Sequence, residues 1–359
     1  MRILIATPMF PPDQAGIALQ TSMLAKGLRA AGHEAKVIAF SPRDASDAAA
    51  DEHVTFVDRR LRQRAFSPSL WWTLRRLAGW ADVVNVHGYT RLNLHAWLAR
   101  RGRPLFVTYH GTDVWSYDPS QGLGIFGRLN RRARIVCVSQ PLADALQEKT
   151  GVPSAVVEPA IADGYIGAAQ RTGPPAKADP PAALYVKSFY PVNCHDAAIR
   201  AMQRVCERLP GAQLWLAGDG PLRGELESLA ADLGIRDNVK FLGLLDNEQL
   251  VEKYSQASAF VNTASLESYG NVTVEALACG APAVACETAG GKSLAAQFPD
   301  DIQLVPQGDI GALADAIRDR LAEPRPVTPR ALAAIAADKS TAAMTAKYLA
   351  LFEQSASPE

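Results

Sequence analysis

Short apolar runs alternate with longer amphipathic segments along the whole chain. The first run covers residues 2–7, and the helical pattern that follows it covers about 19–31 and ends at Gly32. The next runs are continuously apolar, which is typical of parallel strands buried on both faces. They cover residues 35–40, 82–88, 105–111 and 134–140. This part of the chain therefore predicts a βαβ domain built on a parallel sheet.

The same rhythm returns after residues 162–181, where Gly, Pro and Ala crowd together and predict a linker. Strands are then predicted at 183–188, 212–220, 238–243, 258–263 and 282–286. The pattern predicts an α/β protein of two Rossmann-like, doubly wound domains, residues 1–165 and 182–327, facing each other across a cleft. Such sheets bind ligands beyond the carboxyl ends of their strands, so residues after strand ends are the candidates for chemistry.

The composition is that of a soluble globular protein, with 48% hydrophobic and 21% charged residues in a chain of 359. We find no secretory signal and no uncharged apolar run of about 18 residues. The five cysteines form no Cys-x-x-Cys pair and indicate reduced thiols. These features predict a cytoplasmic protein without a membrane span.

The net charge is zero, but it is unevenly distributed, because the first 170 residues contain 20 Lys and Arg against 14 Asp and Glu. Residues 58–80 combine six arginines with Trp71, Trp72 and Trp80. This stretch could contact an anionic membrane surface or a lipid-linked acceptor, or it could be an ordinary helix with its tryptophans in the core. No nucleic-acid-binding module accompanies it, so nucleic acid is not an expected partner.

Two glutamates stand out in the segment from 262 to 285, which runs from a strand end through a helix to the next strand. Seven residues separate Glu267 from Glu275, and the helix is predicted to start near Asn271. A helix N-terminus can bind phosphate, and Glu275 would lie about one turn further in, within reach of ribose hydroxyls. Taken alone, both glutamates could equally be solvated carboxylates.

This segment and the preceding one, LAGDGPLRGELESLAADLGIRDNVKFLGLLDNEQLVEKY, together resemble the donor-binding half of the family 4 retaining glycosyltransferases, which have the GT-B fold. The resemblance implies transfer of a sugar from a nucleoside diphosphate sugar to an acceptor hydroxyl. The acceptor would be a polysaccharide or lipopolysaccharide precursor, or another glycan, lipid-linked or small-molecule acceptor. It also implies that the helical tail, residues 328–359, packs back on the first domain.

The resemblance also assigns roles to individual residues. Glu275 matches the residue that holds the ribose, and Glu267 matches the one beside the transferred sugar. The turn between them would present backbone N–H groups to sugar and phosphate; it comprises Ser268, Tyr269, Gly270, Asn271 and Val272. A strand end near the base would be formed by Phe241, Leu242 and Gly243. Two further glycines, Gly218 and Gly220, match a turn that shapes the domain.

In the first domain, Gly16 follows the first strand and could bring its backbone close to a diphosphate. The family usually has two glycines at this loop, whereas this chain has Ala15 before Gly16. His110 matches a family histidine near the reacting centre, although a lone histidine can also be a structural hydrogen-bonding group. Asp113 is a weaker neighbour in the same segment.

The largest departure from the family pattern follows the strand at 183–188. Ser188 and Asn193 occupy the places of an Arg and a Lys that neutralise the diphosphate. Lys187 could replace them, or strand alternation could turn it away. Cys194 and His195 lie nearby and are expected to have core or surface roles.

The chain contains no Asp-x-Asp motif, so we expect metal-independent chemistry without a cofactor. Two alternatives to a transferase remain open from the sequence. The missing cations would suit a nucleotide-sugar binding or scaffold protein without turnover. A nucleotide-sugar epimerase or hydrolase could also use the same fold.

Overall fold

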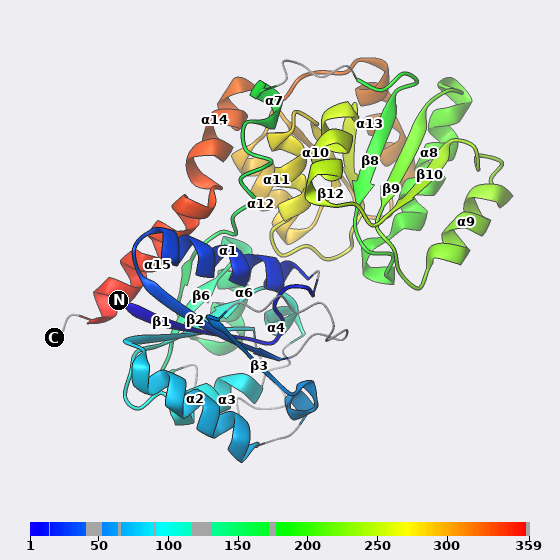
Figure 1. Cartoon of the computed structure of the whole chain (residues 1–359). Helices are drawn as coiled ribbons and strands as arrows, with labels where there is room; N and C mark the ends of the chain where they lie inside the picture. Colours follow the sequence, from blue (N-terminus) through cyan, green and yellow to red (C-terminus); the bar gives the residue numbers. More distant parts are fainter. Residues whose placement is uncertain are drawn as a thin grey trace. The chain divides into compact units, whose positions relative to one another are not determined.

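The computed structural model describes residues 1–13, 15–40, 52–63, 66–88, 91–116, 131–171 and 177–356. The chain forms two compact units (Figure 1). The first unit contains Met1–Ala160 together with Thr341–Glu359, and the second contains Ile161–Ser340. The first unit is thus built from two separate stretches of chain.

The first unit is built on a seven-stranded sheet whose paired strands all run parallel. Its strand order is β3-β2-β1-β4-β5-β6-β7, so the winding direction reverses between β1 and β4. This reversal is the topological switch point of a Rossmann-type sheet. The strands are β1 (Arg2–Thr7), β2 (Glu34–Phe40), β3 (Val54–Val57), β4 (Val83–His87), β5 (Leu105–Tyr109), β6 (Arg134–Cys137) and β7 (Ser154–Val156).

Helices cover both faces of this sheet. One face packs against α2 (Pro68–Trp80), α3 (Arg91–Ala99) and α6 (Gln140–Thr150). The other packs against α1 (Gly16–Ala30) and the last helix, α15 (Thr341–Ala356). Figure 1 shows α1 and α15 side by side, and a side chain at Gly27 of α1 would overlap Thr345 of α15. The shorter elements are η2 (Arg59–Gln63) and α4 (Thr112–Trp115).

The second unit repeats this plan with six parallel strands in the order β10-β9-β8-β11-β12-β13. The order reverses between β8 and β11, which defines a second switch point. The strands are β8 (Ala182–Val186), β9 (Gln213–Ala217), β10 (Val239–Gly243), β11 (Ala259–Asn262), β12 (Ala283–Cys286) and β13 (Ile302–Val305).

The helices of the second unit also form two layers. One layer includes α10 (Asn247–Gln256), α11 (Asn271–Ala278), α12 (Ala289–Gln297) and α14 (Pro329–Asp338). The other includes α8 (His195–Arg208), α9 (Arg223–Asp232) and α13 (Ile310–Ala322). The remaining described elements are α7 (Ala168–Arg171) and η4 (Pro191–Asn193).

The predicted α/β class with two parallel, doubly wound sheets is confirmed. Four predicted strands ran two or three residues too far, because the chain turns toward the next helix earlier than expected. Strands β5, β6, β8 and β9 end at Tyr109, Cys137, Val186 and Ala217. Strands β3, β7 and β13 were not predicted. The stretch predicted as a linker without periodic structure contains the short helix α7, and its residues 172–176 lie outside the described residues.

Candidate active site

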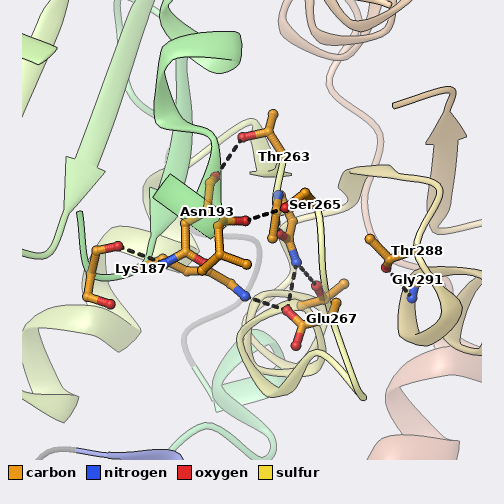
Figure 2. A network of polar contacts seen from close by, with 12 residues as sticks. Lys187, Asn193, Thr263, Ser265, Glu267, Thr288 and Gly291 are labelled. Carbon is orange, nitrogen blue, oxygen red and sulfur yellow. Dashed lines mark hydrogen bonds and ion pairs between the residues drawn. The ribbon is translucent and has the colours of Figure 1, made fainter. Parts of the chain in front are cut away.

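The two strands at the switch point of the second unit are followed by residues of opposite charge. Lys187 directly follows β8, and Glu267 lies in the loop after β11. Figure 2 shows Lys187 Nζ directed at Glu267 Oε2, with 2.5 Å between these atoms. Only 15% of the Lys187 side chain and 16% of the Glu267 side chain are exposed. The Lys187 side chain is therefore turned toward the loop that carries Glu267.

Asn262, the last residue of β11, holds the loop that carries Glu267 through three hydrogen bonds. Its Nδ2 donates to Glu267 Oε2 at 3.3 Å and to Thr273 Oγ1 of α11 at 3.5 Å. Its Oδ1 accepts from the backbone N–H of Ala264. The Glu267 carbonyl accepts from the N–H of Gly290 in α12. We did not identify Asn262 from the sequence, although an amide at the end of an apolar strand was a signal.

The two positions that lack the family's cations form a tight turn. The Nδ2 atom of Asn193 donates to the Ser188 carbonyl at 2.7 Å, and the Asn193 carbonyl accepts from the hydroxyls of Tyr185 and Thr263. Asn193 is buried. His195 is also buried and stacks on the Tyr185 ring at 4.5 Å, which agrees with the predicted core role. This turn fixes the backbone that follows Lys187.

Helix α11 begins without a side-chain cap on its first backbone N–H groups. Its N-cap is Gly270, which has a φ of 108° that favours glycine, and no side chain caps the helix. The Tyr269 ring is buried in the core, 5.7 Å from Lys339 Nζ, and Val272 also packs on this core. Ser268 is half-buried. This turn can therefore meet a ligand through its backbone, as the resemblance implies.

Glu275 lies one turn into α11 and accepts a hydrogen bond from the Tyr254 hydroxyl at 3.1 Å. Burial raises the pKa of Glu275 to about 7, and the hydrogen bond from Tyr254 opposes this shift. The Tyr254 ring packs edge-on against Tyr165. We did not identify Tyr254 from the sequence, because only the fold brings α10 beside α11.

The end of β10 is half-buried. The Phe241 ring meets Phe189 edge-on at 6.0 Å and lies 5.8 Å from the Arg223 guanidinium. Leu242 packs on the core of the unit.

Three glycines form the turns near this strand end. Gly243 has a φ of 72°, and its carbonyl accepts from the N–H of Gly218. A Cβ at Gly218 would overlap the Lys187 carbonyl, and one at Gly220 would overlap the Phe189 backbone. Both glycines thus shape the fold.

In the first unit, His110 follows β5 and contacts a second histidine, His87, which is buried. His110 Nε2 is 3.0 Å from Nδ1 of His87, the last residue of β4. The backbone N–H of His110 donates to the Asp113 carboxylate, which also accepts from the backbone N–H of Gly111. Burial lowers the pKa of His110 to about 4 and that of His87 well below its ordinary value. We did not identify His87, although Asn85 and His87 visibly interrupt an apolar strand.

Gly16 is the first residue of α1, and Ala15 is its N-cap without a side-chain bond. A Cβ at Gly16 would have no atom within 4 Å among the described residues. The position is therefore open to a ligand, and its assignment to the diphosphate stays a prediction.

The basic aromatic stretch is partly buried and partly exposed. The residues Leu70, Leu74 and Leu77 of α2 are in the core, while Trp71 and Trp80 are partly buried. Trp72 is 65% exposed and Phe66 is 46% exposed. Arg62 and Arg64 lie outside the side chains that the structure describes. Among the described helices, none has the length and apolarity needed to cross a bilayer.

None of the five cysteines forms a disulfide, and all five lie in the described part of the chain. In the described parts of the chain, His, Cys, Asp and Glu side chains form no group of three suited to a metal ion.

Two Rossmann-type sheets, each with polar side chains at its switch point, define the class of two-domain nucleotide-binding α/β proteins. The model of the glycosyl transferases group 1 family matches residues 168–338, and the model of Glycosyltransferase Family 4 matches residues 15–162. The chain therefore belongs to the family 4, group 1 glycosyltransferases, which are enzymes of the GT-B fold.

Curated relatives and solved structures agree with this family. The chain is 28% identical over 280 residues, or 72% of each chain, to a GDP-mannose-dependent phosphatidylinositol monomannoside mannosyltransferase of Mycolicibacterium smegmatis. It is 32% identical over 278 residues, 68% of this chain and 59% of the relative, to a D-inositol 3-phosphate glycosyltransferase of Streptomyces avermitilis. Anabaena HepE in complex with UDP and glucose superposes with a TM-score of 0.77 at 19% identity, covering 99% of this chain and 100% of HepE.

Proposed function

We propose that this glycosyltransferase is a retaining, metal-independent enzyme that takes its sugar from a nucleoside diphosphate sugar. The observation that supports this most directly is the Lys187–Glu267 pair at the second switch point, beside the uncapped start of α11. A cation and a helix N-terminus can together bind a diphosphate. When Lys187 binds the phosphates instead of Glu267, the Glu267 carboxylate can accept hydrogen bonds from sugar hydroxyls.

In this proposal Lys187 moves from Glu267 to the diphosphate, because its ammonium is a point charge on a flexible stem. The start of α11 and the backbone at Gly16 share the phosphate charge. Glu275 accepts from the ribose hydroxyls, and Glu267 and His110 bind the transferred sugar. The bond between the anomeric carbon and the phosphate oxygen breaks, and the acceptor oxygen bonds to that carbon on the same face. The acceptor proton passes to the departing diphosphate.

The relatives bear on the substrates by their names. One relative uses GDP-mannose, and HepE was solved with UDP and glucose. We therefore propose a GDP- or UDP-sugar as donor and a glycan, lipid-linked or small polyol acceptor, as in polysaccharide or glycolipid biosynthesis. The exposed side chains of Phe66 and of Trp72 and Arg76, which are one turn apart on α2, support peripheral contact with an anionic membrane from the cytoplasmic side.

Calorimetric titration of UDP, GDP and ADP, without metal and with Mg²⁺, tests the donor site. We expect one nucleotide to bind without metal and its affinity to fall at least about tenfold in Glu275→Ala. Binding that requires Mg²⁺ would contradict metal independence. Binding without any turnover of UDP-glucose or GDP-mannose would instead favour a scaffold, for which Ser188 and Asn193 are the motivating residues.

Product analysis tests the reaction class. Incubation of the nucleotide sugar without an acceptor separates a transferase from an epimerase or a dedicated hydrolase. We expect slow release of free sugar without an acceptor, and no epimerised nucleotide sugar. The anomeric configuration of the transferred sugar, read from its NMR coupling constants, tests retention.

A further inference from the structure

A chain of buried polar side chains leads from the last helix to His110. Asn85 and His87 alternate along β4, Thr108 and His110 alternate at β5, and the two strands pair with His87 beside Thr108. All four side chains therefore lie on one face of the sheet. That face is the one covered by α15, and its Tyr348 is also buried.

The members of this chain are in hydrogen-bond contact from end to end. The Tyr348 hydroxyl donates to Thr108 Oγ1 at 3.3 Å, and the Thr108 hydroxyl donates to Asn85 Oδ1 at 3.2 Å. The Asn85 amide nitrogen lies 3.1 Å from His87 Nε2, and His87 Nδ1 lies 3.0 Å from His110 Nε2. Asn85 and Thr108 are fully buried, and His87 is 1% exposed.

The donors and acceptors of this chain fix the positions of its protons. Asn85 uses its oxygen to accept from Thr108, so its N–H groups face His87 Nε2, which must accept. A neutral His87 then carries its proton on Nδ1 and donates it to His110 Nε2. His110 in turn carries its proton on Nδ1, where no described residue provides an acceptor. Burial lowers the pKa of both rings, which keeps both imidazoles neutral, and the Asp113 carboxylate on α4 opposes this shift for His110.

We propose that His87 is a positioning residue that holds His110 as the neutral tautomer with an Nδ1–H donor for the sugar nucleotide. Asn85 and Thr108 set the direction of this chain, and Tyr348 anchors it to α15. The Nδ1–H donates to an oxygen of the bound donor sugar, which supports the sugar as the bond to phosphate breaks. This inference rests on the proposed function for its ligand, but the tautomers themselves do not.

Nitrogen NMR of the full chain labelled with ¹⁵N-histidine tests the tautomers without any substrate. The chain has six histidines, and His87→Asn and His110→Asn assign the two signals of interest. At pH 7 we expect both rings to be neutral, with Nδ1 protonated and Nε2 unprotonated in each. A proton on His110 Nε2, or a charged ring, would overturn the proposal even if the enzyme proves to be an active transferase.

Kinetics test the positioning role. His87→Leu removes the donor to His110, while His87→Asn keeps an N–H close to the place of Nδ1. We measure release of UDP or GDP from UDP-glucose or GDP-mannose, and nucleotide affinity by calorimetry. We expect kcat to fall about 10- to 100-fold in His87→Leu and to recover to within about threefold of the parent in His87→Asn. Nucleotide affinity should stay unchanged in both, since neither variant alters the nucleotide contacts proposed for the second unit and for the Gly16 backbone.

His95→Leu is the matched control, because His95 is a buried histidine of the same unit whose ring nitrogens bond to the backbone of Ser67 and Arg91. It should lose stability as His87→Leu does but keep the parent kcat. Equal kcat values in His87→Leu and His95→Leu would contradict the positioning role. If no nucleotide sugar is turned over, the proposed function fails, and the NMR measurement still decides the tautomers.

Discussion

The ammonium of Lys187 and the carboxylate of Glu267 form a largely covered pair, so water screens them less than an open surface pair. Lys187→Met removes the positive charge at nearly constant length. We expect it to weaken UDP or GDP binding about tenfold and to leave uridine or guanosine binding within about twofold. Calorimetry with the diphosphate and the free nucleoside measures the difference. Lys240→Met, at an exposed lysine of the same unit, should change neither affinity.

The stability of the second unit should depend on pH through Glu275. Its pKa is about 7 in the folded chain against an ordinary value of 4.5. Between these values the folded state holds more protons than the unfolded state. The contribution of Glu275 to the free energy of unfolding is therefore greatest below about pH 4.5 and is lost as the pH rises to about 7. This loss amounts to roughly 1 to 3 kcal/mol, and Glu275→Gln should flatten the corresponding part of the pH dependence.

Urea denaturation of the parent and of Glu275→Gln at several pH values from 4.5 to 8 measures this slope. Glu248→Gln, at an exposed position of α10, serves as the control. Identical slopes in the parent and Glu275→Gln would show that this carboxyl titrates normally.

The residues that we propose as ligand contacts could be selected from a local motif in the sequence, whereas the residues that hold them in place could not. Glu267 and Glu275 lie at a recognisable spacing around a helix start. The partners Asn262, Tyr254 and His87 come from neighbouring strands and helices, so their contacts exist only after the sheets are assembled. Polar residues at the ends of buried strands were the signal that the sequence offered for Asn262 and His87.

Among the elements, α12 packs unusually close to the loop that carries Glu267. A Cβ at Gly290 would lie 2.7 Å from the Glu267 carbonyl oxygen and 2.9 Å from the Tyr269 nitrogen. Gly290→Ala must therefore displace backbone, and we expect a loss of about 1 to 3 kcal/mol together with weaker nucleotide binding. Gly224 lies in α9, and a Cβ there would have no atom within 4 Å among the described residues. Gly224→Ala should therefore raise the free energy of unfolding by up to about 1 kcal/mol and leave nucleotide binding unchanged. Thermal unfolding and calorimetry compare the two.

The long buried strands were predictable because their continuous apolar runs match a two-sided parallel sheet. The missed strands are short, with three residues in β7 and four in β3 and β13. Both β3 and β7 are only half-buried throughout. Strands β6, β11 and β12 also have only four residues, but they are almost wholly buried and were predicted from their apolar runs. A short run without such burial lacks this signal, so the neighbouring strand, rather than the local sequence, determines it.

For the whole molecule, the first unit depends on residues 341–359. Phe352 is fully buried and meets Phe106 of β5 edge-on at 4.9 Å. Phe352→Ala should cost the first unit about 3 to 5 kcal/mol without affecting the second. Hydrogen exchange followed by mass spectrometry reads the two units separately. Glu353→Ala, at the exposed neighbour, should leave both unchanged, and equal loss of protection in both units would contradict this assignment.

The split of the first unit between two stretches of chain also has a consequence for synthesis on the ribosome. The sheet face formed by residues such as Ile3 and Ile5 is synthesised before the second unit, whereas α15, which covers it, is synthesised after that unit. The continuous second unit can fold while translation is still under way, since domains generally fold as units. The apolar face of the first sheet therefore stays uncovered until α15 has been synthesised.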